Sequence, residues 1–132
     1  MRRAEDGFTN HLEGFSTSVF CLSTASTGWS QYTTLAALYG CIPVIVQDNI
    51  TMPFEEELPH EHFSLRFAVQ DAANLVELLK EITAEEVAKL QEGLQCVWRR
   101  FVWSSVHGSY AGEAATEDAF ATLMAVLNLH LK

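Results

Sequence analysis

The chain has 132 residues, which suits one modest domain, and 48% of them are hydrophobic, which is enough for a real core. The formal charge is −9, with 17 Asp and Glu against 8 Lys and Arg. This charge repels phosphate backbones and acidic membranes, so it argues against nucleic acid and against membrane contact by this segment. No run is apolar enough to span a membrane, and the polar start has no signal-peptide core. As written, the chain is expected to stay in the cytosol.

The first predicted strand is a short apolar run, SVFCL at 18–22, which is expected to be buried. A small-residue loop follows, and apolar spacing of three and four residues then predicts a helix that ends at Gly40. The next run, IPVIV at 42–46, is apolar at every position, as in a strand buried on both faces of a parallel sheet.

The second half of the chain is predicted to be mainly helical. Alternation in HFSLRF at 62–67 predicts a third strand near an edge, and DAANLVELLKEI at 71–82 predicts a helix. In this helix Leu75, Val76, Leu78 and Leu79 are expected to face inward. Thr83 and Glu86 form a capping-box pattern before a long helix. A last helix begins near Thr116 and Asp118 and places Phe120, Leu123, Met124 and Leu127 on one face.

This element order predicts an α/β fold, a Rossmann-like parallel sheet covered by helices. In open α/β sheets, ligands bind beyond the carboxyl ends of the strands. Those ends are the loops 23–30 and 47–57. The sequence therefore predicts a ligand site formed by these two loops.

The three cysteines are too few for a disulfide framework and lack metal-ligand spacing. Cys21, Cys41 and Cys96 are each expected in the core as small apolar side chains, and the odd count leaves a free thiol possible. The pair His60 and His62 could form half of a metal site, but two ligands without a nearby third favour a solvated loop, so no metal is expected.

Several short motifs occur together in one order: FCL before a Gly-containing loop, GCIPVI, Asp48 at the end of that strand, and PFE at 53–55. This run resembles the carboxy-terminal half of the exostosin-type glycosyltransferases, and the resemblance covers about residues 10–105. It implies half of a two-domain GT-B fold, with residues 1–105 as a nucleotide-sugar-binding half domain. Residues 106–132 would be a linker and a C-terminal helix packing on it.

The resemblance implies a transferase that moves a sugar from a nucleotide-sugar donor, UDP-linked, to a glycan or glycoprotein acceptor. No resident cofactor is expected. The acceptor half, stem and membrane anchor are expected to be missing from this chain, whereas full-length family members are Golgi membrane proteins. No catalytic base can be assigned, because that group is expected from the missing half. The alternative is a non-catalytic remnant or interaction domain that keeps the fold.

Seven residues are predicted to bind the donor, and each has a physical reason. Gly28 lets the backbone approach a diphosphate at a helix amino terminus, and the Thr and Ser hydroxyls add hydrogen-bond donors. The carboxylate of Asp48 or Glu55 could accept hydrogen bonds from sugar or ribose hydroxyls, and Trp29 could cover a ring. The residues are Thr27, Gly28, Trp29, Ser30, Thr33, Asp48 and Glu55. For Thr27 and Ser30, a helix cap is an equally good interpretation. Pro53 and Phe54 are interpreted as structural.

The chain departs from the family pattern at three positions. Tyr32 stands where the family usually has an Arg that contacts the diphosphate, Leu35 replaces an acidic residue, and Gln70 replaces a carboxylate. Between Arg3 and Arg66 there is no Lys or Arg, so a diphosphate would depend on backbone N–H groups, hydroxyls and His60 or His62. Weak donor binding is therefore expected.

Overall fold

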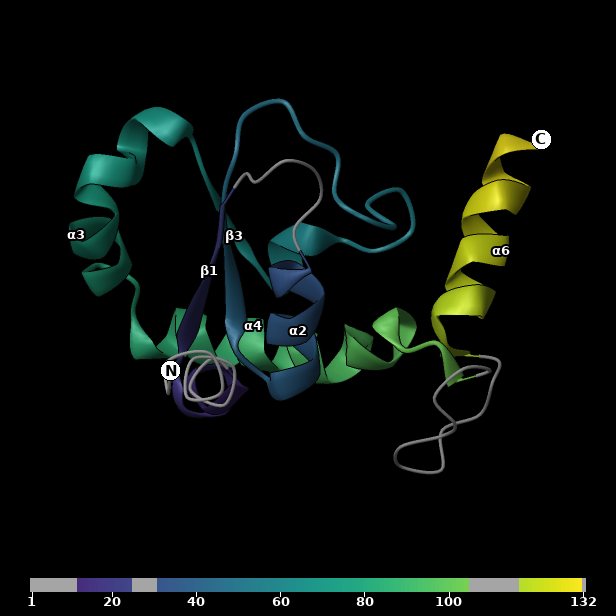
Figure 1. The fold of residues 1–132 in the computed structure, drawn as a ribbon, viewed down its shortest axis with the longest axis horizontal. Helices are drawn as coiled ribbons and strands as arrows, with labels where there is room; N and C mark the ends of the chain where they lie inside the picture. The colour runs from purple at the N-terminus through teal and green to yellow at the C-terminus, as the bar shows by residue number, and fades with distance from the viewer. Residues whose placement is uncertain (1–11, 25–30, 105–116, 132) are drawn as a thin grey trace, which may run out of the picture.

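The computed structural model describes residues 12–24, 31–104 and 117–131. It contains a parallel three-stranded sheet in the order β1-β2-β3, made of β1 (Phe20–Thr24), β2 (Ile42–Val46) and β3 (Leu65–Phe67). Helix α2 (Tyr32–Tyr39) connects β1 to β2, and α4 (Ala84–Val97) crosses near one end of the sheet (Figure 1). The predicted α/β class with a parallel sheet is confirmed.

The first half of the chain folds much as its sequence pattern predicts. Strand β2 spans the predicted residues and is buried at every position, because helices cover both of its faces. Helix α2 ends at Gly40, whose φ of 74° is left-handed and lets its N–H reach the carbonyls of Ala36 and Ala37. Strand β1 begins and ends two residues later than predicted, and β3 covers only the end of its predicted run.

Register divides the sheet residues between two faces. Cys21 and Ser23 share a face with Ile45 and lie under α2, and Cys21 packs with Ala36. The other face presents Ile42, which packs with α4 and with η3 (Trp98–Phe101) in the main cluster. That cluster contains Ala37, Ile42, Leu58, Phe63, Leu90, Leu94 and Phe101.

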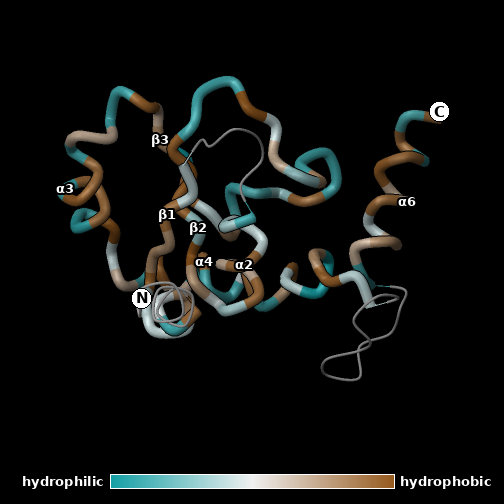
Figure 2. The backbone as a smooth tube through the Cα atoms, in the orientation of Figure 1, coloured by the Kyte–Doolittle hydropathy of each residue, from teal (hydrophilic) through white to brown (hydrophobic). Residues whose placement is uncertain are grey.

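The segment 71–82 does not form the single helix that was predicted. The chain forms a 3-10 segment η2 (Val69–Asn74) and then a short helix α3 (Leu75–Lys80), and neither contains a buried residue. Leu75, Val76, Leu78 and Leu79 are therefore not in the core as predicted, and Val76 is 64% exposed. The apolar residues of α3 do have amphipathic spacing. Within the described residues, however, no element packs closely over α3, which stands to one side of the sheet (Figure 2).

Helix α4 begins as predicted. Thr83 Oγ1 accepts from the Glu86 N–H, and the Glu86 carboxylate accepts from the Thr83 N–H, so both halves of the capping box form. The last helix, α6 (Ala119–His130), starts at Asp118, whose side chain accepts from the Ala121 N–H. It packs on η3, but Phe120, Met124 and Leu127 are exposed.

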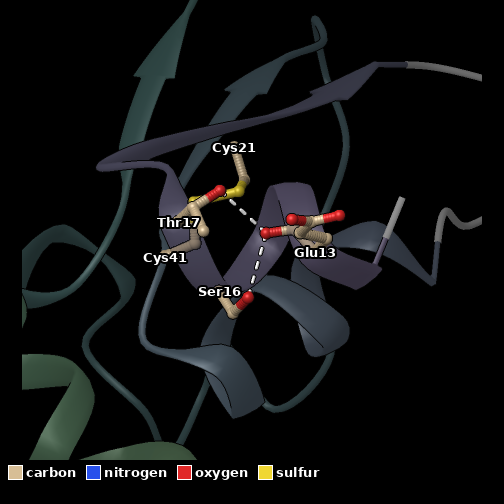
Figure 3. Close-up of a disulfide and its surroundings, with 5 residues drawn as sticks. All are labelled: Glu13, Ser16, Thr17, Cys21 and Cys41. Atoms are coloured by element: carbon tan, nitrogen blue, oxygen red, sulfur yellow. Dashed lines mark hydrogen bonds between the residues drawn. A yellow bond between two sulfur atoms is a disulfide. The ribbon is translucent and has the colours of Figure 1, made fainter. Parts of the chain in front are cut away.

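The cysteines are the largest correction to the sequence analysis. Cys21 and Cys41 form a disulfide with Cα atoms 5.8 Å apart (Figure 3). Cys96 is exposed rather than buried. Parallel pairing places Cys21 opposite Pro43, and Cys41 lies just before β2. The bond therefore links the start of β1 to the end of the α2 crossover, beside the helical segment 12–17.

Candidate functional site

The carboxyl ends of β1 and β2 lie at the same edge of the sheet, because the two strands are parallel and in register from Phe20 and Ile42 to Thr24 and Val46. Helix α2 starts near this edge, and the segment that follows Val46 leads into a turn at 53–57. The predicted Thr27, Gly28, Trp29 and Ser30 lie outside the described residues. The N-cap of α2 is Gln31, so neither Thr27 nor Ser30 is that N-cap.

Thr33 is inside the fold and is not available to a ligand. It is 3% exposed, and its Oγ1 lies 2.8 Å from Ser23 Oγ in a buried hydrogen bond. This bond connects the first turn of α2 to the second half of β1. Thr33 therefore positions the amino terminus of α2 at the edge of the sheet.

Replacing Thr33 with valine, which keeps the shape and removes the hydroxyl, is expected to lower the free energy of unfolding by about 1–3 kcal/mol. The reason is that Ser23, 2% exposed, would keep a buried hydroxyl without this partner. Urea denaturation measures the change. The matched control is Thr34→Val, on a partly buried neighbour in the same helix, and equal losses in both variants would contradict the role assigned to the Ser23–Thr33 bond.

Asp48 and Glu55 both lie beyond β2, and both contact the protein. Asp48 is exposed, and its Oδ1 accepts from the Val69 N–H at 3.2 Å, which ties the end of β2 to the segment after β3. Glu55 Oε2 accepts from the Met52 N–H at 2.6 Å, while Oε1 pairs with Arg66 at 3.0 Å. The two predicted carboxylates are therefore at the predicted edge and hold its loops in place.

Arg66 is a candidate site residue that the sequence analysis did not name as such. It is the first basic residue after the long gap, and it lies on β3, where register places it beside Ile45 on the face covered by α2. Its guanidinium reaches the turn after β2 through Glu55. The loop beyond β2 therefore does have a cation beside it, although no Lys or Arg lies between Arg3 and Arg66 in the sequence.

The turn itself is shaped by packing. Phe54 adopts a positive φ of 60°, which is rare for an aromatic residue, and its ring contacts Phe101. Its carbonyl accepts from the Leu58 N–H, and Leu58 is buried in the main cluster. The structural role predicted for Phe54 is confirmed.

His60 is not the solvated side chain that was predicted. It is 4% exposed, its ring lies 4.6 Å from that of Phe63, and its Nε2 donates to the Pro53 carbonyl at 3.0 Å. Its buried Nδ1 has no hydrogen-bond partner among the described groups. Burial lowers the pKa of His60 below its ordinary value of 6.5, so the ring is neutral at pH 7 and cannot serve a diphosphate as a cation.

The lowered pKa of His60 predicts a pH dependence of stability. The unfolded chain binds this proton more readily than the folded one, so stability is expected to be full above about pH 6.5 and to fall as the pH drops below it. Urea midpoints measured across this window should decrease toward acid. His60→Phe should reduce the dependence of the urea midpoint on pH, because this ring no longer titrates. His62→Gln, a change at an exposed neighbour, should leave that pH dependence unchanged.

The two histidines do not form a metal site together. Both belong to the 3-10 turn η1 (His60–His62), where one is buried and the other exposed. Across the described ranges, no three His, Cys, Asp or Glu side chains are grouped to hold a metal ion.

Two hollows in the described surface lie away from the carboxyl edge. One of about 490 Å³ is lined by Leu35, Leu38, Tyr39, Trp98 and Val102. Another of about 440 Å³ shares Leu38, Tyr39 and Trp98 with it. Both border the end of α2 that leads into the start of β2, so they are not part of the predicted site.

Comparison with known proteins identifies the family. The model of the Exostosin GT47 domain matches residues 2–82. From Arabidopsis thaliana, the probable glucuronoxylan glucuronosyltransferase F8H is 35% identical over 78 residues, covering 58% of this chain and 17% of the relative. The probable beta-1,4-xylosyltransferase IRX10 is 32% identical over 84 residues, covering 63% and 20%.

A rice protein, the probable glucuronosyltransferase GUT1 of Oryza sativa subsp. japonica, is 33% identical over 82 residues, covering 61% of this chain and 20% of the relative. The chain therefore spans about a fifth of the length of these relatives. No helix within the described part of the chain is long and apolar enough to cross a membrane. Because the family model covers more than half of the sequence, the chain belongs to the exostosin GT47 family.

Proposed function

We propose that this chain is the donor-binding half of a GT-B glycosyltransferase that transfers a sugar from a UDP-linked donor to a glycan or glycoprotein. The observation that carries the proposal is the meeting of three features at one edge of the sheet. These are the carboxyl ends of β1 and β2, the amino terminus of α2, and a loop carrying Asp48 and Glu55, which pairs with Arg66 of β3. Ligands of open α/β sheets bind at such an edge.

The chemistry assigned to this half is stabilisation of the departing nucleotide. As the bond between the anomeric carbon and the diphosphate breaks, negative charge grows on the phosphate oxygens. Backbone N–H groups at the start of a helix are suited to donate hydrogen bonds to these oxygens. The Ser23–Thr33 bond holds those N–H groups in place. The group that deprotonates the acceptor hydroxyl is assigned to the other half of the full-length enzyme.

The relatives indicate the class of sugar. Their names describe probable transferases of glucuronosyl and xylosyl groups in plants, so a sugar nucleotide of that kind is the proposed donor. The acceptor is then proposed to be a polysaccharide.

The disulfide supports a place for the domain in the secretory pathway. Disulfides persist in oxidising compartments and are rare in the cytosol. The Cys21–Cys41 bond therefore favours folding in the lumen of the endoplasmic reticulum and work in the Golgi, rather than the cytosolic location expected from the start of the sequence.

A second candidate function is a remnant that keeps the fold without donor binding, and specific contacts favour it. Where the family usually has an Arg, Tyr32 stacks on Phe15 with ring centroids 6.0 Å apart. Thr33 is buried, and Glu55 is bonded through both oxygens. In this alternative, the contacts at the carboxyl edge stabilise the fold only.

Titration of the isotope-labelled chain with UDP, followed by amide NMR, separates the two functions. Donor binding predicts saturable shifts in the amides at the start of α2 and in the 48–55 segment, with ADP giving weaker or no shifts. Uniform small changes, or none at millimolar UDP, would favour the remnant. The amides of α4 and α6, which lie outside the proposed site, serve as internal controls.

A further inference from the structure

We infer that the proposed donor site selects an uncharged sugar over a uronic acid. The reason is that Glu55 neutralises Arg66, the cation that reaches the loop 47–57 beyond β2. The inference rests on the proposed donor-binding function. It concerns the sugar ring of the donor and adds a specificity-determining ion pair to the site.

The geometry fixes Glu55 on both sides. Its Oε1 lies 3.0 Å from the Arg66 guanidinium, and its Oε2 accepts from the Met52 N–H at 2.6 Å. The carboxylate is therefore held by two independent bonds from two segments. A donor carboxylate that approached Arg66 would have to displace a partner that the fold already holds in place.

Both members of the pair are reachable. The side chains of Arg66 and Glu55 are 40% and 30% exposed, so a ligand can approach them. They lie at the carboxyl edge of the sheet, since Glu55 follows β2 and Arg66 pairs with Ile45 one residue before β2 ends. The pair can therefore influence a bound sugar.

The surrounding charges are acidic. Asp48 is exposed at the end of β2, and Glu56 and Glu57 share the turn with Glu55. Glu56 also pairs with His130 at 2.6 Å, and residues 47–59 contain no Lys or Arg. A uronate carboxylate placed here meets like charge, whereas the hydroxyls of a neutral sugar can donate hydrogen bonds to these same oxygens.

The test compares two donors that differ only by the carboxylate on the sugar ring, UDP-xylose and UDP-glucuronic acid. Calorimetry or NMR on the full chain should give tighter binding of UDP-xylose, by a factor on the order of ten, as expected for one uncompensated like-charge contact. Equal binding, or tighter binding of UDP-glucuronic acid, would overturn the inference while leaving donor binding intact.

Two variants test the ion pair itself. Glu55→Gln frees Arg66 and should shrink the preference for UDP-xylose severalfold or reverse it. Arg66→Gln removes the cation and should keep the preference or enlarge it. The control Glu57→Gln removes the same charge from the same turn without freeing Arg66, so it should alter the ratio less than Glu55→Gln does.

The ratio of the two affinities cancels any general loss of folded protein, and the amide spectrum of each variant confirms the fold. If Glu55→Gln and Glu57→Gln change the ratio equally, net charge and not the pair sets it, and the inference is wrong. If neither UDP nor either sugar nucleotide binds, the proposed function fails and the inference fails with it.

Discussion

Replacing Cys21 and Cys41 together by serine is expected to lower the free energy of unfolding by about 3 kcal/mol. The bond joins residues 20 apart in sequence and closes a loop that contains all of α2. Without it, the unfolded chain gains the conformational freedom of that loop. For a domain of this size, a loss of this magnitude is a large fraction of the total stability. The midpoint of guanidinium denaturation measures it.

Cys96→Ser is the matched control, because Cys96 is exposed and not bonded. It should leave the midpoint unchanged, while a reducing agent should shift wild type toward the Cys21→Ser, Cys41→Ser variant. A double variant as stable as wild type would contradict this role of the bond. The variant should also weaken UDP binding, because the disulfide borders Ala36 in the helix whose amino terminus is proposed to hold the diphosphate.

Local patterns in the sequence predicted the elements that depend on local chemistry. The apolar run of β2, the glycine at the end of α2 and the capping box of α4 are each decided within a few residues, and all three appear in the structure. The family motifs at 48–55 also located the loop beyond β2 correctly. Such features need little knowledge of what packs on them.

Features that depend on distant contacts were not predictable from the same patterns. The disulfide requires the parallel pairing that sets Cys21 beside Pro43, and cysteine count alone argued against it. His60 is buried because the 60–62 turn packs under α4 and against Phe101, although a run of His and Glu suggests a surface. In α3, the apolar spacing predicted burial, but the described residues supply no covering element for Val76.

The bonding of the predicted site residues did not follow from the sequence. Thr33 was expected to offer its hydroxyl to a ligand, whereas Ser23, ten residues earlier, occupies it. The missing positive charge was inferred from chain order, yet β3 brings Arg66 across the sheet to Glu55. The alternation of β3 could have predicted which face of the sheet Arg66 lies on. Its pairing with Glu55 could not be predicted, because it depends on the shape of the turn at Phe54.

Replacing Gly93 with alanine is expected to lower the free energy of unfolding by about 2–3 kcal/mol, although alanine favours a helix interior over glycine by about 1 kcal/mol. A Cβ at Gly93 would lie 2.0 Å from the His62 carbonyl oxygen and 2.9 Å from its carbon. These are backbone atoms of η1 and cannot rotate away. Helix α4 must therefore move from η1, which opens the packing of Leu90 and Leu94 on Phe63.

Gly14→Ala is the matched control, because Gly14 lies in the helical segment 12–17 and a Cβ added there would meet no described atom within 4 Å. It should be neutral or stabilise by up to about 1 kcal/mol. Urea denaturation of both variants measures the contrast, and a Gly93→Ala protein as stable as wild type would contradict the close approach of α4 to η1.

The effect of Gly93→Ala should also reach the candidate site. The connection runs through His60 in η1, whose Nε2 donates to the Pro53 carbonyl. Pro53 begins the turn that carries Glu55, the partner of Arg66. Displacement of η1 should therefore shift the amide signals of Met52 and Glu55, whereas Gly14→Ala should not. A glycine in α4 would then limit the geometry of the proposed donor site, because backbone packing of α4 on η1 fixes the turn.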